Sequence, residues 1–352
     1  MATAHTADKH IPATSDRIAP ALITLHQRRS AVLGVIGRNE QARSGLSRAL
    51  ALAAARGDRS QQAAALLALS ELEYIEGNFP AMLAAARRSR DLFQALGERE
   101  NAGETLGNMG LALMAQGKHD EALPLLQQAL AAAEQAGNDE NQGFGLNNIG
   151  LLHDNRGDPA TAAAYLLRAI DRQQGCGNLR GLQLCCNNLS AIYGKLGRHG
   201  EAREMAERAY RIAQRIGDRQ GQGYTLGAMG SAALRGGDPQ RALQLLTESL
   251  RIRAEVGDLS GQGEALHNIA VVLDRLGRQD EALGHFQRAL SVKAAIGDRL
   301  STVITNKRIG MIHQARGDRE QARAHYAEAL HTAEDLGNGP LSDELRQALA
   351  QL

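Results

Sequence analysis

In residues 97–137 the chain reads GERENAGETLGNMGLALMAQGKHDEALPLLQQALAAAEQAG, and Gly97, Gly117 and Gly137 stand 20 residues apart in it. Helices often end on a residue in the left-handed conformation, which glycine adopts without steric cost. Each 20-residue block therefore predicts one helix of about 16 residues and a tight turn, so two blocks form a repeat of two helices. The spacing continues at Gly37, Gly57, Gly77, Gly157, Gly177, Gly197, Gly217, Gly237, Gly257, Gly277, Gly297, Gly317 and Gly337.

The residues around these glycines agree with helix boundaries. Most of the glycines are followed by Asp or Asn, which are preferred N-cap residues. In Asp158-Pro159 and Asp238-Pro239 the proline occupies the first helical position, where a missing N–H costs nothing. We therefore predict that each turn glycine ends one helix and that the next helix begins directly after it.

Three positions of the 40-residue repeat carry small side chains, which let two helices approach closely. The first position holds Ala in six successive repeats, the second Ala or Ser, and the third mostly Gly. Their members are Ala122, Ala162, Ala202, Ala242, Ala282 and Ala322; Ala129, Ala169, Ala209, Ser249, Ala289 and Ala329; and Gly110, Gly150, Ser190, Gly230, Ala270 and Gly310.

This pattern resembles that of the tetratricopeptide family, W-x2-L-G-x2-Y followed by A-x3-F. Here it reads Leu106-x2-Met109-Gly110-x2-Leu113, then Ala122-x3-Leu126, and the match covers about residues 60–337. The usual repeat has about 34 residues and ends in Pro, whereas this one has 40 and ends in Gly-Asp or Gly-Asn. The longer form is similar to the repeats of the Pins/LGN spindle adaptors, of kinesin light chains and of many bacterial regulators. HEAT or armadillo repeats, which also have about 40 residues, are the second choice. The two halves of the repeat are equal in length here, and the three small-residue positions fall where the tetratricopeptide fold needs them.

The resemblance implies an all-α, right-handed solenoid of eight helix-turn-helix repeats over residues 16–339. We expect residues 1–15 to be disordered and residues 340–352 to form a capping helix, because Leu341, Leu345, Leu349 and Leu352 recur at helical spacing. The first repeat is atypical, since His26 and Arg29 occupy positions that are apolar elsewhere.

Composition limits the classes of function. The net charge is +1 and aromatic residues make up 3%, which argues against binding nucleic acid. No apolar run approaches the roughly 18 residues of a membrane span, and the N-terminus has no signal-peptide core. Three cysteines, Cys176, Cys185 and Cys186, give no disulfide framework, and we expect Cys176 and Cys186 to lie in the core. We predict a cytoplasmic protein without membrane contact, and the excess of Arg and Ala suggests a bacterial source.

No catalytic signature is present: the chain has no P-loop, no G-x-S-x-G and no H-E-x-x-H. His153 and His313 share one position of the repeat, and His285 and His325 share another, a full repeat apart. We therefore expect that the protein is not an enzyme and that it has no cofactor and no metal site.

Asparagine recurs on the predicted first helices, and its amide can both donate to and accept from a peptide backbone. In the resembled family, Asn in this position lines a concave groove and binds the backbone of an extended ligand. We predict such a groove here, although Asn could also be a tolerated surface residue or bond to the neighbouring helix. The predicted residues are Asn108, Asn148, Asn188 and Asn268, with Asn147 and Asn187 beside two of them and Phe144 and Tyr224 on the same helix face.

Charge varies along the predicted groove. Its C-terminal half carries Lys195, Arg235, Arg275, Lys307 and Arg308, and its N-terminal half carries Glu71, Glu104 and Asp154. A ligand with its acidic end toward repeats five to eight would be complementary. Arg308 and Ala228 interrupt the series of Asn residues.

These features predict a scaffold or adaptor that binds an extended peptide segment of a partner protein. The alternative is a regulatory sensor that binds a small signal peptide or metabolite and acts in trans on a partner. Self-association through exposed repeat ends is possible in either case.

Overall fold

The structure is a computed structural model that describes residues 21–26, 29–30 and 39–352. The predicted disordered segment 1–15 and the turn at Gly37 lie outside the described residues. Residues 21–26 and 29–30 are helical, and the described residues contain no strand. Sixteen further helices follow: α2 Asn39–Ala55, α3 Arg59–Ile75, α4 Phe79–Leu96, α5 Arg99–Ala115, α6 His119–Ala136, α7 Asp139–Asn155, α8 Pro159–Gly175, α9 Leu179–Lys195, α10 His199–Arg215, α11 Arg219–Arg235, α12 Pro239–Glu255, α13 Leu259–Arg275, α14 Gln279–Ala295, α15 Arg299–Arg316, α16 Arg319–Asp335 and α17 Gly339–Ala350.

The helices end where the glycine spacing predicts. Each of the described turn glycines, every 20 residues from Gly57 to Gly337, has a positive φ between 66° and 84°. The following Asp or Asn often caps the next helix: the Asp158 side chain accepts the N–H of Thr161 at 3.0 Å. Most helices span 17 residues, slightly more than predicted, because only three residues remain for each turn.

The small residues mark close contacts between the two helices of a repeat. A Cβ atom added to Gly110 in α5 would lie 2.5 Å from Cδ2 of Leu126 in α6. In repeat eight, a Cβ on Gly310 of α15 would lie 2.6 Å from the ring of the buried Tyr326 in α16. The third small position therefore has to be small because a large side chain of the facing helix packs directly against it.

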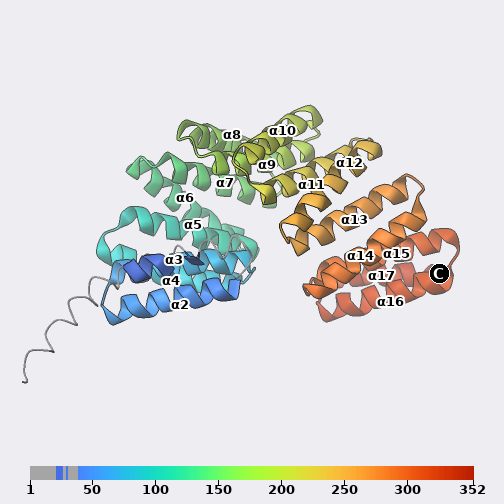
Figure 1. The fold of residues 1–352 in the computed structure, drawn as a ribbon, viewed down its shortest axis with the longest axis horizontal. Helices are drawn as coiled ribbons and strands as arrows, with labels where there is room; N and C mark the ends of the chain where they lie inside the picture. Colours follow the sequence, from blue (N-terminus) through green and yellow to red (C-terminus); the bar gives the residue numbers. More distant parts are fainter. Residues whose placement is uncertain (1–20, 27–28, 31–38) are drawn as a thin grey trace, which may run out of the picture. The chain divides into compact units, whose positions relative to one another are not determined.

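The chain divides into two compact units, of which the first ends at Gly181 and the second runs from Leu182 to Leu352. Figure 1 labels the helices, which in each unit follow one another in antiparallel pairs. The first helices of successive repeats also contact one another, as α3, α5 and α7 do in the first unit and α11 and α13 in the second. Each unit is thus an all-α solenoid in which these first helices lie side by side.

At the C-terminal end, α17 packs on α15 and α16. Leu345 is fully buried beside Val303 and Tyr326, and Leu341 and Leu349 are partly buried on the same surface.

The cysteines differ in part from expectation. Cys185 and Cys186 are buried, and desolvation raises their pKa values to about 12 and about 11. The prediction that Cys176 lies in the core is wrong: it is exposed, because it is the C-cap of α8, at the helix end before Gly177.

Candidate functional site

In the first unit, the predicted Asn residues lie on neighbouring first helices. Asn108 of α5 and Asn148 of α7 are half-buried. Asn108 donates to the Ser70 hydroxyl of α3 at 3.0 Å, which is the helix-bridging role considered as the alternative. The Asn148 Oδ1 accepts a bond from Asn147 at 3.2 Å, while its Nδ2 has no partner among the described residues. Asn148 therefore keeps two donors that a ligand could use.

The second unit contains the remaining members of the series. Asn188 of α9 and Asn268 of α13 are half-buried. Asn187 accepts the hydroxyl of Thr225 in α11 at 3.0 Å, so it too links two first helices. The Asn268 amide makes no hydrogen bond to any described residue, and both its donors and its acceptor remain open.

Asn147 does not belong to an exposed surface. It is only 2% exposed, so its predicted place in a ligand-binding groove is wrong. Because neighbouring residues on a helix point about 100° apart, Asn147 turns into the packing between helices while Asn148 faces outward.

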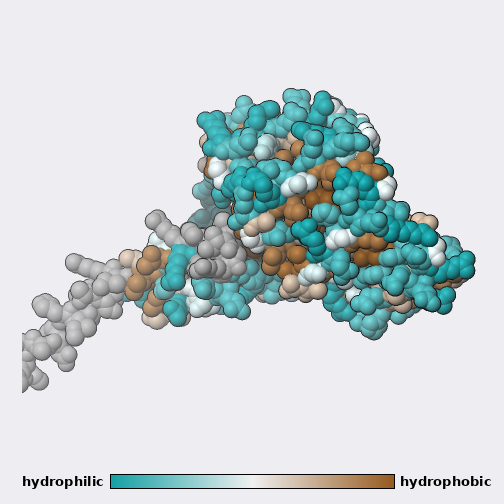
Figure 2. Space-filling view, turned by 45° about the vertical axis from the view of Figure 1, so that its right-hand side comes forward, coloured by the Kyte–Doolittle hydropathy of each residue, from teal (hydrophilic) through white to brown (hydrophobic). Residues whose placement is uncertain are grey.

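Apolar side chains flank the Asn positions. Phe144 is half-buried in the first unit, and Tyr224 is 55% exposed in the second. The position of Tyr224 in the repeat is taken by Leu184, 43% exposed, and by Ile304, 41% exposed, which sequence analysis did not single out. Comparing that position across repeats would have found them. Figure 2 shows brown, apolar patches on an otherwise hydrophilic face.

The predicted basic residues have mixed surroundings. Lys195, Arg235 and Arg275 are exposed in the last turns of α9, α11 and α13. Arg275 donates to the carbonyl of Leu234 at 3.0 Å, so it also caps the end of α11. Lys307 pairs with Glu344 of α17 at 2.6 Å, whereas Arg308 is exposed.

The first unit carries acidic groups on the same layer of helices. The Glu71 side chain of α3 is exposed, yet desolvation by the surrounding protein and the charge of Glu104 raise its pKa to about 7. Desolvation and the charges of Glu100 and Glu140 also raise the pKa of Glu104. This surface is therefore suited to cationic rather than anionic groups.

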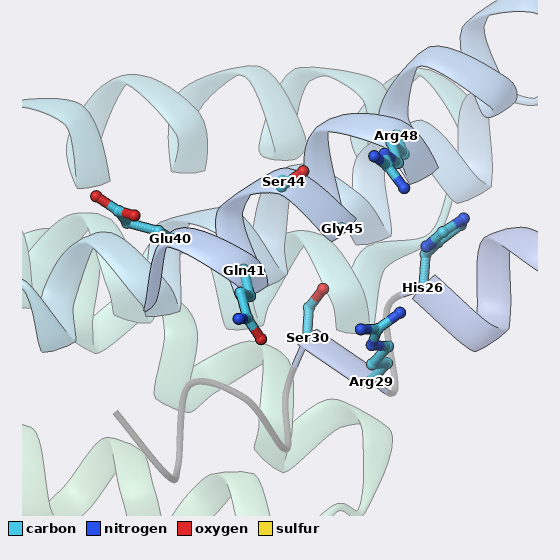
Figure 3. A pocket seen from close by; sticks show the side chains of 8 residues that line it. All are labelled: His26, Arg29, Ser30, Glu40, Gln41, Ser44, Gly45 and Arg48. Carbon is cyan, nitrogen blue, oxygen red and sulfur yellow. The ribbon is translucent and has the colours of Figure 1, made fainter. Parts of the chain in front are cut away.

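One cavity of about 320 Å³ lies at the N-terminal end, between the helical residues 21–26 and 29–30 and helix α2. His26 and Arg29, the atypical residues of the first repeat, line it together with Arg48 and the buried Ser30. Figure 3 shows the three basic side chains near one another and Glu40 at the other end.

A second cavity, of about 360 Å³, lies in the second unit between α13 and α15, at the end of α14. It is lined by Ser260, Glu264, His267, Lys293, Asp298, Ser301 and Ile304. Lys293 is only 5% exposed, and desolvation lowers its pKa. Sequence analysis did not single out this lysine, although the same position in half of the repeats is Ala.

Two of the histidines stack on aromatic rings of the neighbouring helix, which the sequence comparison between repeats did not predict. The rings of His313 and His325 stack at 5.8 Å between centroids, as do His153 and Tyr165 at 5.4 Å. Both pairs join the same two positions of a helical hairpin, so the stacking is a packing feature of the repeat. In the described part of the chain no three His, Cys, Asp or Glu side chains gather as a metal site. None of the described helices is both long and apolar enough to cross a membrane.

A sequence model of the tetratricopeptide repeat matches residues 101–175, 183–255 and 261–335, so the chain belongs to the tetratricopeptide repeat family. A search of curated protein sequences gave no match.

Several solved structures share the fold. The Rap conjugation gene regulator of plasmid pLS20, in complex with the Phr* peptide, is 16% identical over 84% of this chain and 80% of its own, with a TM-score of 0.65. Aspartyl phosphate phosphatase F from Bacillus subtilis is 17% identical over 80% and 73%, with a TM-score of 0.61. The quorum sensor NprR from B. thuringiensis, in its apo form, is 13% identical over 94% and 98%, with a TM-score of 0.53.

Proposed function

We propose that this protein binds an extended peptide segment of a partner along the layer of first helices. The observation that carries the proposal is the pair of Asn148 and Asn268, whose amides are half-buried but not fully bonded within the described residues. Exposed apolar side chains, such as Tyr224 and Ile304, stand beside the Asn positions and offer contacts for the side chains of a ligand. The proposal assigns binding rather than catalysis.

The membership in the tetratricopeptide family supports a role in protein interaction. The Rap regulator of similar fold is named as a complex with a peptide. We infer that the first helices of this chain serve the same general purpose.

A second function is favoured by the names of the structural neighbours. Two of them are a conjugation gene regulator and a quorum sensor. In that case the ligand is a small signal peptide, and the protein acts on a separate partner after a change in its solenoid. Small-angle scattering with and without ligand distinguishes the two, because only a sensor has to change shape on binding.

The experiment uses the double variant Asn148→Ala and Asn268→Ala. Binding to a partner captured from the native host should weaken by about one to four orders of magnitude, because each lost bond leaves a buried peptide group unsatisfied at about 1–3 kcal/mol. The melting temperature should stay constant or rise slightly, since Ala favours helix more than Asn.

Two controls separate binding from folding. Asn155→Ala changes an exposed Asn at the end of α7 and should leave both quantities unchanged. Asn108→Ala breaks the bond to Ser70 and should lower the melting temperature. Unchanged partner affinity in the double variant would rule out the proposed binding surface.

A further inference from the structure

Two buried cations occupy the same position in successive repeats. Arg253, in the last turn of α12, is 3% exposed, and Lys293, in the last turn of α14, is 5% exposed. Burial of a charge is costly unless a partner compensates it. In the other described repeats this position is uncharged: Ala53, Phe93, Ala133, Gln173, Ala213 and Ala333.

Arg253 has its partner within the protein. Its Nη1 donates to the carbonyl of Gly261 at 2.7 Å and to the carboxylate of Glu264 at 2.8 Å, both in α13. The guanidinium therefore has an oppositely charged group in direct contact, and the contact links the end of one repeat to the first helix of the next.

Lys293 has no such partner. Its Nζ donates to the carbonyl of Ser301 at 3.2 Å and to the hydroxyl of Thr305 at 2.8 Å, both neutral acceptors. No described carboxylate lies within ion-pair distance, and the residue that corresponds to Glu264 one repeat later is Ile304. An ammonium has three donors, so one donor of Lys293 remains for a further acceptor.

The space for that acceptor is present. Lys293 lines the cavity of about 360 Å³, and two exposed residues, Ser260 of α13 and Ile304 of α15, line it as well. This volume lies in the range of about 300–1,000 Å³ that small-ligand pockets occupy. It lies on the first-helix layer assigned above to peptide binding.

We propose that this cavity binds a carboxylate of the ligand, which takes beside Lys293 the place that Glu264 takes beside Arg253. The proposal rests on the peptide-binding function, because a peptide supplies the carboxylate either as an acidic side chain or as its C-terminus.

The charged groups around the cavity leave Lys293 without a carboxylate in contact. The lining carries the cation Lys293 and the two carboxylates Glu264 and Asp298, and the neighbouring Arg308 adds a second cation, whose charge acts on His267. Both carboxylates are already engaged: Glu264 with Arg253, and Asp298 as the N-cap that accepts the N–H of Ser301 at 3.1 Å.

The test observes Lys293 directly. The chain has only five lysines, Lys9, Lys118, Lys195, Lys293 and Lys307, so labelling with ¹³Cε-lysine gives a short NMR spectrum in which Lys293→Met assigns one signal. N-acetylglutamate α-amide supplies a side-chain carboxylate, N-acetylalanine a C-terminal one, and N-acetylglutamine α-amide is the neutral control. We expect a saturable shift of the Lys293 signal with one or both carboxylates and none with the neutral amide. The stronger of the two probes identifies the source of the carboxylate.

Two variants check the site. Lys293→Met should weaken binding of the carboxylate probe about 10- to 100-fold, followed by calorimetry, while the protein stays folded. Ile304→Glu places a carboxylate beside Lys293, as Glu264 lies beside Arg253. It should therefore raise the pKa of Lys293 and prevent the carboxylate probe from binding. Equal effects of the carboxylates and the neutral amide, or no shift of Lys293 with any probe, would overturn the proposal. These measurements need no partner, so their failure leaves the Asn148 and Asn268 experiment as a separate test of peptide binding.

Discussion

At the scale of single residues, His267 illustrates how the cavity controls ionisation. Its half-buried ring lies edge-on to Phe286, 5.2 Å away between centroids, and its Nδ1 lies 3.0 Å from the hydroxyl of Thr305. Desolvation and the charges of Lys293 and Arg308 lower the pKa of His267 to about 3. The imidazole is therefore neutral near pH 7, and acid must charge it against its surroundings.

This shift predicts a loss of stability in acid. Between the unfolded pKa of about 6.5 and the folded value, the unfolded chain binds one more proton, so the free energy of unfolding falls as the pH falls. His267→Asn removes that proton uptake and places there the residue that two other repeats use, Asn147 and Asn187. From about pH 7 to about pH 4 the wild type should lose about 3 kcal/mol more than the variant in urea unfolding. His331→Asn, which removes an exposed imidazole, is the control, and parallel pH profiles of wild type and His267→Asn would contradict the assignment.

The burial and the contacts of individual side chains could not be predicted from the sequence. The recurring Asn positions could be found by comparing repeats, but the comparison could not show that Asn147 is buried while Asn148 is half-exposed. Nor could it reveal the uncompensated Lys293, because the missing carboxylate at Ile304 is defined by a contact across helices and not by a motif.

At the scale of the elements, the turn glycines determine where helices end. Gly217 has φ 69° and donates to the carbonyl of Gln214 at 3.2 Å, and Asp218 donates to that of Ala213 at 2.9 Å. The Asp218 carboxylate then accepts the N–H of Gly221 at 2.9 Å and starts α11. Two helices thus meet within three residues, and this local chemistry is why their boundaries could be predicted from sequence.

The variant Gly217→Val tests this geometry. No atom lies within 4 Å of a Cβ added at Gly217, so the cost comes from the backbone and not from a clash. A β-branched residue at positive φ should lower the free energy of unfolding by about 1–2 kcal/mol or more. Gly284→Ala, at an open helical position of α14, should instead raise it by about 0.5–1 kcal/mol. Chemical denaturation of both variants checks the pair, and equal stability of Gly217→Val and wild type would show that the turn does not need glycine.

At the scale of the whole molecule, each unit is stabilised by contacts between neighbouring helices, so a terminal repeat has one apolar face without a following repeat. In the second unit α17 covers this face: Leu345 is fully buried against residues that include Val303 and Tyr326. The repeat organisation could be predicted because it is periodic. The division into two units at Gly181 could not, because the spacing continues through it unchanged.

Removal of residues 341–352 should therefore expose the apolar surface of α15 and α16. Burial of one Leu side chain contributes about 1.5–3 kcal/mol, so loss of Leu345 alone destabilises the last repeat, and the exposed surface favours self-association. We expect the truncated protein to form dimers or larger species whose fraction rises with concentration in sedimentation velocity, and to melt at a lower temperature. Gln347→Ala changes an exposed residue of α17 without uncovering Leu345 and should behave as wild type. The full-length variant Leu345→Asp should reproduce the self-association of the truncated chain, because a buried carboxylate detaches α17. If the truncation and Leu345→Asp both sediment as the wild type does at every concentration, then α17 does not protect the end of the solenoid.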